Sequence, residues 1–361
     1  METLTNNQTL RQSRVSRIIQ IHPTLNCNLA CKHCYSSSSP GVKKELDVNS
    51  INNIIEQAAH IGYNVISMSG GEPFLYKPLE ELIAYSKSLG YFNSVTTNGM
   101  LLNTERAKRI IKNLDLIAIS VDGKEEFHDT MRSQKGAFKK MLEGVEIVKN
   151  SIEKYGFIHT LLPENWELLP WLTEFALAHK ASLLHLHPLE MSGRANESFN
   201  GLKFTATDLY KIYIAHHFLK THYEKEIYLQ LDLLHKDNFV DNPNFVFHQS
   251  FKPELTAQSF SSIFKELIID EKGDILPIAH GCSKFFRIGN IHTKAKLTEM
   301  IEYFMEEKFE YVVDLYNLTY QEIMNDNEYE IFNWSEHVIE KSHQMFSKII
   351  SHQLSAYEKI A

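Results

Sequence analysis

The stretch RIIQIHPTLNCNLACKHCYSSSSP, residues 17–40, joins an apolar run to three of the four cysteines in this 361-residue chain. The run at 17–22 has the length of a buried strand, and the polar segment after it predicts a loop. Cys27, Cys31 and Cys34 would all lie on that loop. Structural zinc sites use four ligands, commonly as two pairs, and the second pair is missing here. Three thiolates on one loop suit three irons of a [4Fe–4S] cluster, leaving the fourth iron for another ligand.

The composition excludes several classes of protein. The net charge of −8 and pI near 6.1 give no basic excess for nucleic acid or an anionic membrane surface. The first twenty residues are polar and predict no signal peptide, and no apolar run approaches the roughly 20 residues of a membrane span. Four cysteines, three of them crowded, are typical of metal binding or catalysis in a reducing cytoplasm rather than of a disulfide framework.

Short apolar runs alternate with amphipathic segments along the first half of the chain. Such repeated strand–helix units predict a parallel sheet with right-handed crossovers. An open doubly wound sheet and an incomplete barrel both fit six units, and periodicity does not choose between them. Asp47 and Thr104 are predicted helix N-caps. The predicted strands are 17–22, 65–68, 93–97, 116–121, 157–161 and 183–187, and the predicted helices are 48–61, 79–89, 104–113, 136–153 and 168–179.

The pattern changes after residue 195. The sequence predicts a helix at 205–223, a strand at 227–233, a long loop at 237–260, a hairpin near 267–277, and helices from 296 onward. We therefore divide the chain into an N-terminal tail at 1–16, a core at 17–200 and a C-terminal extension at 201–361.

The motif Cys27-x3-Cys31-x2-Cys34-Tyr35 resembles the signature of the radical S-adenosylmethionine (SAM) superfamily, and the resemblance extends over roughly 17–195. It implies an α/β fold, a partial (β/α)6 TIM-like barrel followed by a smaller α+β extension, and so decides for the incomplete barrel. It also implies an enzyme with one [4Fe–4S] cluster and SAM, which one electron cleaves to a 5′-deoxyadenosyl radical that abstracts hydrogen from a substrate. An electron donor such as flavodoxin or ferredoxin is expected.

Further motifs follow the predicted strands and would meet at the carboxyl-terminal rim of the barrel. By resemblance, the Gly-Gly-Glu motif binds the methionine amino group, and Ser120 and Arg132 bind the ribose or carboxylate of SAM. Arg132 could instead be a solvated loop charge and Asp122 a turn residue. His33 and Tyr35 either lie near adenine or simply pack in the loop. The expected SAM-binding residues are His33, Tyr35, Gly70, Gly71, Glu72, Asn98, Ser120, Asp122 and Arg132.

Two histidines of the sixth strand, His185 and His187, point the same way and are expected to line the core or lumen rather than to act in catalysis.

The segment 266–291 resembles the start of a SPASM or twitch extension, which in its relatives carries auxiliary clusters. No cysteine follows Cys282 in this chain, so we expect no auxiliary cluster. Cys282 either packs in a core or donates a hydrogen atom to a substrate radical, as in some radical peptide epimerases. Its neighbours His280 and Gly281 favour an exposed loop and therefore the donor role.

The resemblance favours a peptide substrate, a ribosomally made precursor, with epimerisation as the first choice of reaction. C–C or thioether crosslinking and oxidation of a small molecule or tetrapyrrole are the alternatives. A catalytically silent barrel that binds peptide is the non-enzyme alternative.

Overall fold

The computed structural model describes residues 16–241 and 257–358. Nearly all of the predicted tail at 1–16, and the middle of the loop predicted at 237–260, lie outside the described residues. At both described ends of that segment the loop prediction is wrong, because α9 covers Lys236–Asp241 and α10 covers Ala257–Ile263.

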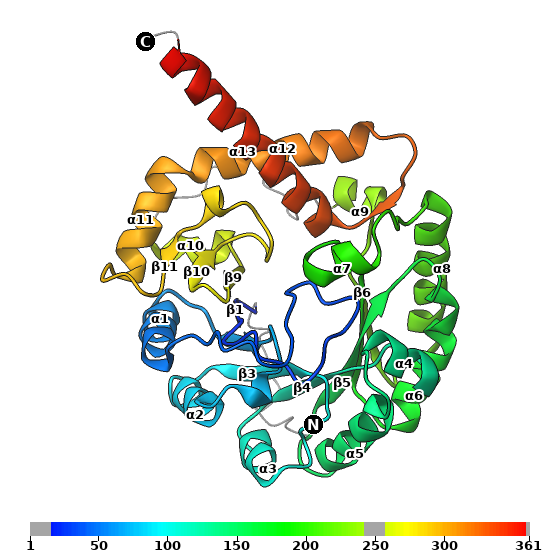
Figure 1. The fold of residues 1–361 in the computed structure, drawn as a ribbon. Coiled ribbons are helices and arrows are strands. Elements are labelled where there is room, and N and C mark those ends of the chain that lie inside the picture. The colour runs from blue at the N-terminus through cyan, green and yellow to red at the C-terminus, as the bar shows by residue number, and fades with distance from the viewer. Residues whose placement is uncertain (1–15, 242–256, 359–361) are drawn as a thin grey trace, which may run out of the picture.

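Strands and helices alternate through the first half of the chain and wrap into a partial barrel with the helices outside (Figure 1). The six predicted strands are present and pair in parallel in sequence order, which confirms the predicted fold class. The elements are β1 (Ile18–Ile21), α1 (Val48–His60), β2 (Val65–Met68), α2 (Leu79–Ser88), β3 (Phe92–Thr97), α3 (Glu105–Ile111), β4 (Leu116–Ser120), α4 (Glu125–Met131), α5 (Ala137–Lys149), β5 (Tyr155–Leu161), α6 (Leu169–Ala178) and β6 (Leu183–Pro188).

The sheet continues past the predicted boundary at residue 200. Strand β7 (Tyr228–Leu231) is parallel to β6, and β9 (Glu266–Ile269) is parallel to β1 on the other side. Antiparallel β10 (Asp274–Leu276) pairs with β9 and forms the predicted hairpin, and β11 (Gly289–Asn290) pairs with β10 and extends the edge further. The order is β11-β10-β9-β1-β2-β3-β4-β5-β6-β7. The division at 200/201 stays a prediction.

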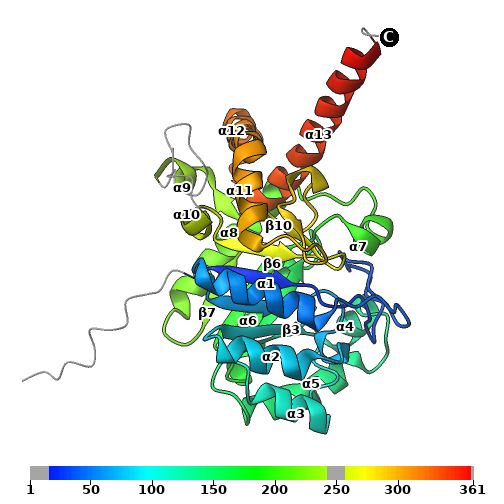
Figure 2. The same ribbon diagram turned by 90° about the vertical axis from the view of Figure 1, so that its left-hand side faces the viewer.

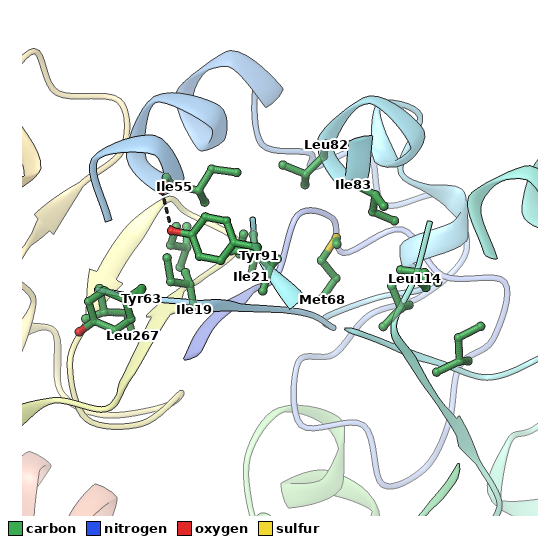
Figure 3. Close-up of a cluster of buried hydrophobic side chains, with 14 of the residues drawn as sticks. Ile19, Ile21, Ile55, Tyr63, Met68, Leu82, Ile83, Tyr91, Leu114 and Leu267 are labelled. Atoms are coloured by element: carbon green, nitrogen blue, oxygen red, sulfur yellow. Dashed lines mark hydrogen bonds between the residues drawn. The ribbon is translucent and has the colours of Figure 1, made fainter. Parts of the chain in front are cut away.

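Alternate side chains of β1 face opposite sides of the sheet, one set toward the hydrophobic core and the other toward the barrel lumen. Ile19 and Ile21 are fully buried and pack toward α1, where Ile55 and the ring of Tyr91 meet them (Figure 3). The Tyr91 hydroxyl donates a 2.6 Å hydrogen bond to the Ile55 carbonyl. Ile18 and Gln20, the alternate residues, line a cavity inside the barrel. The strand therefore holds one face for packing and the other for a ligand.

The helix starts follow from capping. Asp47 accepts from the Ser50 backbone N–H at 2.9 Å, and Thr104 accepts from that of Ala107 at 3.2 Å, so both predicted N-caps are confirmed.

The C-terminal segments lie over one side of the barrel, and α13 extends away from the body (Figure 2). Helix α8 (Ala206–His222) instead packs beside β7 in the outer ring of helices (Figure 1). The other elements of this half are α7 (Gly193–Ser198), β8 (Leu234–His235), α11 (Leu297–Glu307), α12 (Phe309–Asn325), β12 (Ile331–Phe332) and α13 (Trp334–Glu358). Among the described residues, no helix is both long and apolar enough to span a membrane.

Candidate active site

A cavity of about 630 Å³ occupies the barrel lumen and opens past the carboxyl ends of its strands. The lining joins all three clustered cysteines to Glu72, Asn98, Ser120 and Arg132, which lie at or after the ends of three further strands and a helix. Asn333 and Glu336, at the start of α13, also line it. In parallel barrels the carboxyl-terminal rim is where reacting groups are assembled, so this cavity is the candidate active site.

The cysteine loop brings its three sulfurs to one place. Cys27 and Cys31 are buried beside Leu29, and Cys34 and Met100 pack against them. The backbone N–H of Cys34 donates to the Cys31 carbonyl at 3.3 Å, so the last turn of the loop is closed on itself. Burial, together with the charge of Glu72, raises the pKa of Cys27 to about 12.

The donor set fits the expected cluster. Three soft thiol ligands converge at a wall of the cavity, and no fourth cysteine of the described residues accompanies them. Buried thiolates would be costly without a cation, and binding of iron in exchange for the three protons removes that cost.

Arg194, which the sequence analysis missed, fastens the cysteine loop from outside. Its guanidinium donates to the carbonyls of Cys31 and Ser38, both at 2.8 Å, and its backbone N–H donates to the Cys34 carbonyl at 2.9 Å. Arg194 lies in α7, about 160 residues after the cysteine loop in the sequence. No local sequence pattern indicates that the two segments meet.

Glu72 is buried, and both carboxylate oxygens accept hydrogen bonds. Oε1 accepts from the Thr97 hydroxyl at 2.8 Å and from the Phe74 N–H at 3.2 Å, and Oε2 accepts from the Asn98 N–H at 2.9 Å. Burial raises the pKa of Glu72, while these hydrogen bonds oppose the shift. A carboxylate held by three hydrogen bonds beside a cavity, with no ion pair to a side chain of the described residues, is suited to receive an ammonium group.

The two glycines before Glu72 allow the cysteine loop to lie against the strand end. A Cβ at Gly71 would stand 2.4 Å from the Asn26 carbonyl oxygen, and one at Gly70 (φ +97°) would stand 3.0 Å from that of Thr24. Both glycines line the cavity. Glycine is required here because the cysteine loop itself comes so close to both positions.

Arg132 and Asp122 form a buried ion pair. The guanidinium is therefore already occupied, and Asp122 is more than a turn residue. Arg132 Nε and Nη2 donate to the two carboxylate oxygens of Asp122 at 2.6 and 3.0 Å, and Nη1 lies 3.7 Å from Cys31 Sγ. His33 Nε2 lies 2.9 Å from the same carboxylate. The pKa of Asp122 is held well below its usual range because Arg132 and His33 outweigh its burial. The alternative of a solvated Arg132 is wrong.

The remaining expected residues line the same cavity. Asn98 Nδ2 donates to Asn28 Oδ1 at 2.8 Å and lies 4.0 Å from Cys27 Sγ. The Tyr35 hydroxyl lies 3.2 Å from Ser69 Oγ, and Ser120 reaches the lumen with no assigned partner in the described chain. Every residue expected to bind SAM, Asp122 apart, is thus at the wall of one cavity.

The deeper lumen is polar and acidic. His185 and His187 both line it, as expected, and His185 Nε2 lies 2.7 Å from Asp232 Oδ2 beyond β7. Glu266, at the start of β9, faces the same space. Glu266 is exposed to solvent at this end of the strand, yet desolvation by the cavity walls and the nearby charge of Asp232 raise its pKa to about 7.

Cys282 does not lie in the expected exposed loop. Its side chain is 3% exposed and belongs to the main hydrophobic core, and it is absent from the cavity lining, although Ala279 and His280 are present there. The chain turns inward after Gly281, where Ser342 of α13 covers the thiol. The expectation of exposure is therefore wrong, and the geometry supports the packing alternative.

Comparison with known proteins places these features in a family. Residues 21–176 match the model of the radical SAM superfamily. The chain is 30% identical over 264 residues to the Fe-coproporphyrin III synthase of Methanosarcina barkeri, covering 72% of this chain and 64% of that protein. It is 26% identical over 188 residues to the sporulation killing factor maturation protein SkfB of Bacillus subtilis, covering 52% and 46%.

The fold resembles that of anSMEcpe, solved with bound AdoMet and the Cp18Cys peptide, with a TM-score of 0.61 at 15% identity, covering 95% of this chain and 99% of that one. The chain spans between roughly half and two thirds of the length of the two curated relatives. Residues 21–176 of this chain are thus a radical SAM domain, the domain of a superfamily of enzymes that use a [4Fe–4S] cluster and S-adenosylmethionine.

Proposed function

We propose that this chain is a radical SAM enzyme that acts on a peptide. Cys27, Cys31 and Cys34 would hold one [4Fe–4S] cluster, and SAM would occupy the adjoining part of the cavity. Together these groups, when bound, supply a 5′-deoxyadenosyl radical that takes hydrogen from a substrate. The convergence on one cavity of the three thiols and the Glu72 carboxylate, which forms no ion pair among the described residues, carries the proposal.

Three residues of the candidate site have separate roles. Glu72, held by three hydrogen bonds, would receive the methionine ammonium. Arg132 is paired with Asp122 and lies close to Cys31, so we regard it as a positioning residue. Its positive charge would offset the negative charge of the cysteine thiolates and hold the cysteine loop in place. Arg194 holds the same loop from the outer side.

The charge of the cavity favours a peptide over a tetrapyrrole. Its described lining includes the acidic residues Glu72, Glu190, Asp232, Glu266 and Glu336, but no lysine, and its one arginine, Arg132, is already paired. A coproporphyrin carries several carboxylates, which need cations for recognition. A neutral or cationic peptide segment is complementary to these walls.

Among peptide reactions, epimerisation with a cysteine donor has no support from the described lining. The lining holds no thiol other than the three proposed cluster ligands, and Cys282 lies in the core. Crosslinking of the peptide requires no such donor, so the described lining favours it over epimerisation.

The test starts with anaerobic reconstitution. The protein should hold about four irons per chain and produce 5′-deoxyadenosine from SAM and dithionite. The triple variant Cys27→Ala/Cys31→Ala/Cys34→Ala should hold almost none and produce none. If native protein makes no more 5′-deoxyadenosine than the variant, the catalytically silent barrel is correct.

The substrate class is tested separately, by titration with coproporphyrin III and with peptides encoded beside the gene. Peptide should stimulate 5′-deoxyadenosine formation and change in mass. Saturable porphyrin binding that stimulates the reaction would overturn the peptide proposal without affecting the cluster.

A further inference from the structure

A second group of metal-ligating side chains lies next to the cysteine loop but contains none of its residues. It consists of His22, Glu271 and His280, whose ligand atoms all lie within 4.8 Å of one another. The three come from the end of β1, the turn between β9 and β10, and the loop after β10.

The sheet register explains why these distant residues meet. Ile21 pairs with Ile269 in the parallel β1–β9 ladder, and the His22 N–H donates to the Ile269 carbonyl at 2.9 Å. Glu271 therefore emerges just beyond His22 at the same end of the sheet. The loop after β10 then lays the His280 ring over that of His22, with centroids 4.5 Å apart.

Two ring nitrogens in this group are buried without a hydrogen-bond partner among the described residues. They are Nδ1 of His22, whose residue is fully buried, and Nδ1 of His280. His22 Nε2 is 3.4 Å from the Tyr35 hydroxyl, which is the outer contact that commonly orients a ligating histidine and leaves its other nitrogen for the ion.

The carboxylates around His280 stand at ion-pair rather than hydrogen-bond distance. His280 Nε2 is 3.8 Å from Glu271 Oε2, and His280 Nδ1 is 4.0 Å from Glu190 Oε1. Ligand atoms on a tetrahedral zinc lie about 3.4 Å apart, given bonds of about 2.0–2.1 Å. Small rotations of the partly exposed Glu271 and His280 would bring the set to that spacing.

The charges also suit a cation. Burial, followed by the influence of His280, lowers the pKa of His22 to about 3, so its imidazole is neutral and able to ligate. The Glu271 and Glu190 carboxylates stand beside the two different ring nitrogens of His280. Without a metal ion, the positive charge there is a proton on His280, whose pKa is raised to about 9 by Glu190 and Glu271 against the effect of burial.

We propose that His22, Glu271 and His280 bind a divalent transition-metal ion, with zinc as the best match to two imidazoles and one carboxylate. The ion would join the end of β1 to the β9–β10 hairpin. The site uses no cysteine and is separate from the proposed cluster.

The test uses the reconstituted holoenzyme, in which the cluster occupies the three cysteines. After equilibrium dialysis against buffered zinc, mass spectrometry should find about one zinc per chain in addition to the iron. His280→Gln and Glu271→Gln should each weaken zinc binding by at least tenfold with unchanged iron content. His187→Gln, which alters another histidine of the same cavity, should keep the zinc.

Zinc-edge X-ray absorption identifies the ligands. Nitrogen and oxygen scattering alone is expected, and sulfur in the first shell would assign the zinc to the cysteines and overturn the site. Absence of zinc in native protein, or its retention in both variants, would show that only a proton occupies His280. Iron content and 5′-deoxyadenosine report on the proposed function independently of these outcomes.

Discussion

Glu72 is the residue at which binding of SAM can be separated from binding of iron. Its carboxylate is buried and accepts three hydrogen bonds, yet it touches none of the three cysteines through a hydrogen bond. Glu72→Gln keeps the size and removes the charge that would meet an ammonium. We expect SAM affinity to fall at least tenfold, about 1.4 kcal/mol, with full iron content. Equilibrium dialysis with labelled SAM measures this.

The matched control for Glu72 is Glu336→Gln, which alters another glutamate of the same cavity on α13. It should leave SAM affinity unchanged. Equal affinities of the Glu72 variant and native protein would remove Glu72 from the SAM site.

Cys282 provides a second prediction at this scale. Cys282→Ala should load a full cluster and give unchanged product, and it should lower the free energy of unfolding by about 1 kcal/mol through the lost buried sulfur. Thermal denaturation and product analysis in heavy water measure the two effects. Normal 5′-deoxyadenosine formation combined with lost product would restore the donor role.

Residue types at short spacing were predictable, whereas pairings across the chain were not. The C-x3-C-x2-C triplet and the Gly-Gly-Glu motif are local patterns, and both line the cavity as expected. The grip of Arg194 on the Cys31 carbonyl and the meeting of His22 with Glu271 depend on how strands pair. One sequence alone contains no signal for such contacts.

Helix α7 positions the cysteine loop through its first residue. Gly193 has φ +55°, and a Cβ there would stand 2.2 Å from the Tyr35 carbonyl oxygen. Gly193→Ala must therefore push α7 away from the loop that Arg194 holds. We expect lower thermal stability and reduced cluster occupancy after reconstitution, measured by calorimetry and iron analysis.

The chain offers a control for Gly193 just past the same helix. Gly201 also has a positive φ, +80°, but a Cβ there meets nothing within 4 Å. Gly201→Ala should carry only the backbone cost, roughly 1 kcal/mol, and keep full occupancy. Equal iron loss in both variants would mean that strain, not contact with the loop, is responsible.

Elements with a clear spacing of apolar residues were predictable from the sequence, and the short helices were not. The capped helix α1 and all six parallel strands were found because apolar spacing marks them. Helix α4 was missed because its seven residues, EEFHDTM, hold too few apolar positions to show a period. Helix α9 has only six residues, and the sequence predicts a loop there for the same reason.

At the scale of the whole molecule, β7 and β9 are the outermost parallel strands around a lumen whose acidic groups repel one another. Although its side chain is exposed to solvent, the cavity walls and the charge of Asp232 raise the folded-state pKa of Glu266 from its ordinary value of 4.5 to about 7. For an acid with a raised pKa, the folded state is favoured below the ordinary pKa and loses stability as pH rises through the folded value.

Glu266→Gln should therefore raise the melting temperature more at pH 8 than at pH 5. Calorimetry at the two pH values measures the difference. Glu306→Gln, on α11 and outside the cavity lining, should show no such difference. An equal effect of Glu266→Gln at both pH values would mean that its carboxyl titrates normally.

The pairing of β1 with β9 has a consequence for biosynthesis. Ile18 is bonded to Lys265 and His22 to Ile269, so the strand that carries the cysteine loop gains its second neighbour only after some 250 more residues leave the ribosome. Until then its edge is unpaired and open to other strands. In the nascent chain, the strand that supports the cysteine loop would thus gain its full pairing late. Iron delivery would follow synthesis of the C-terminal half rather than accompany translation of the cysteines.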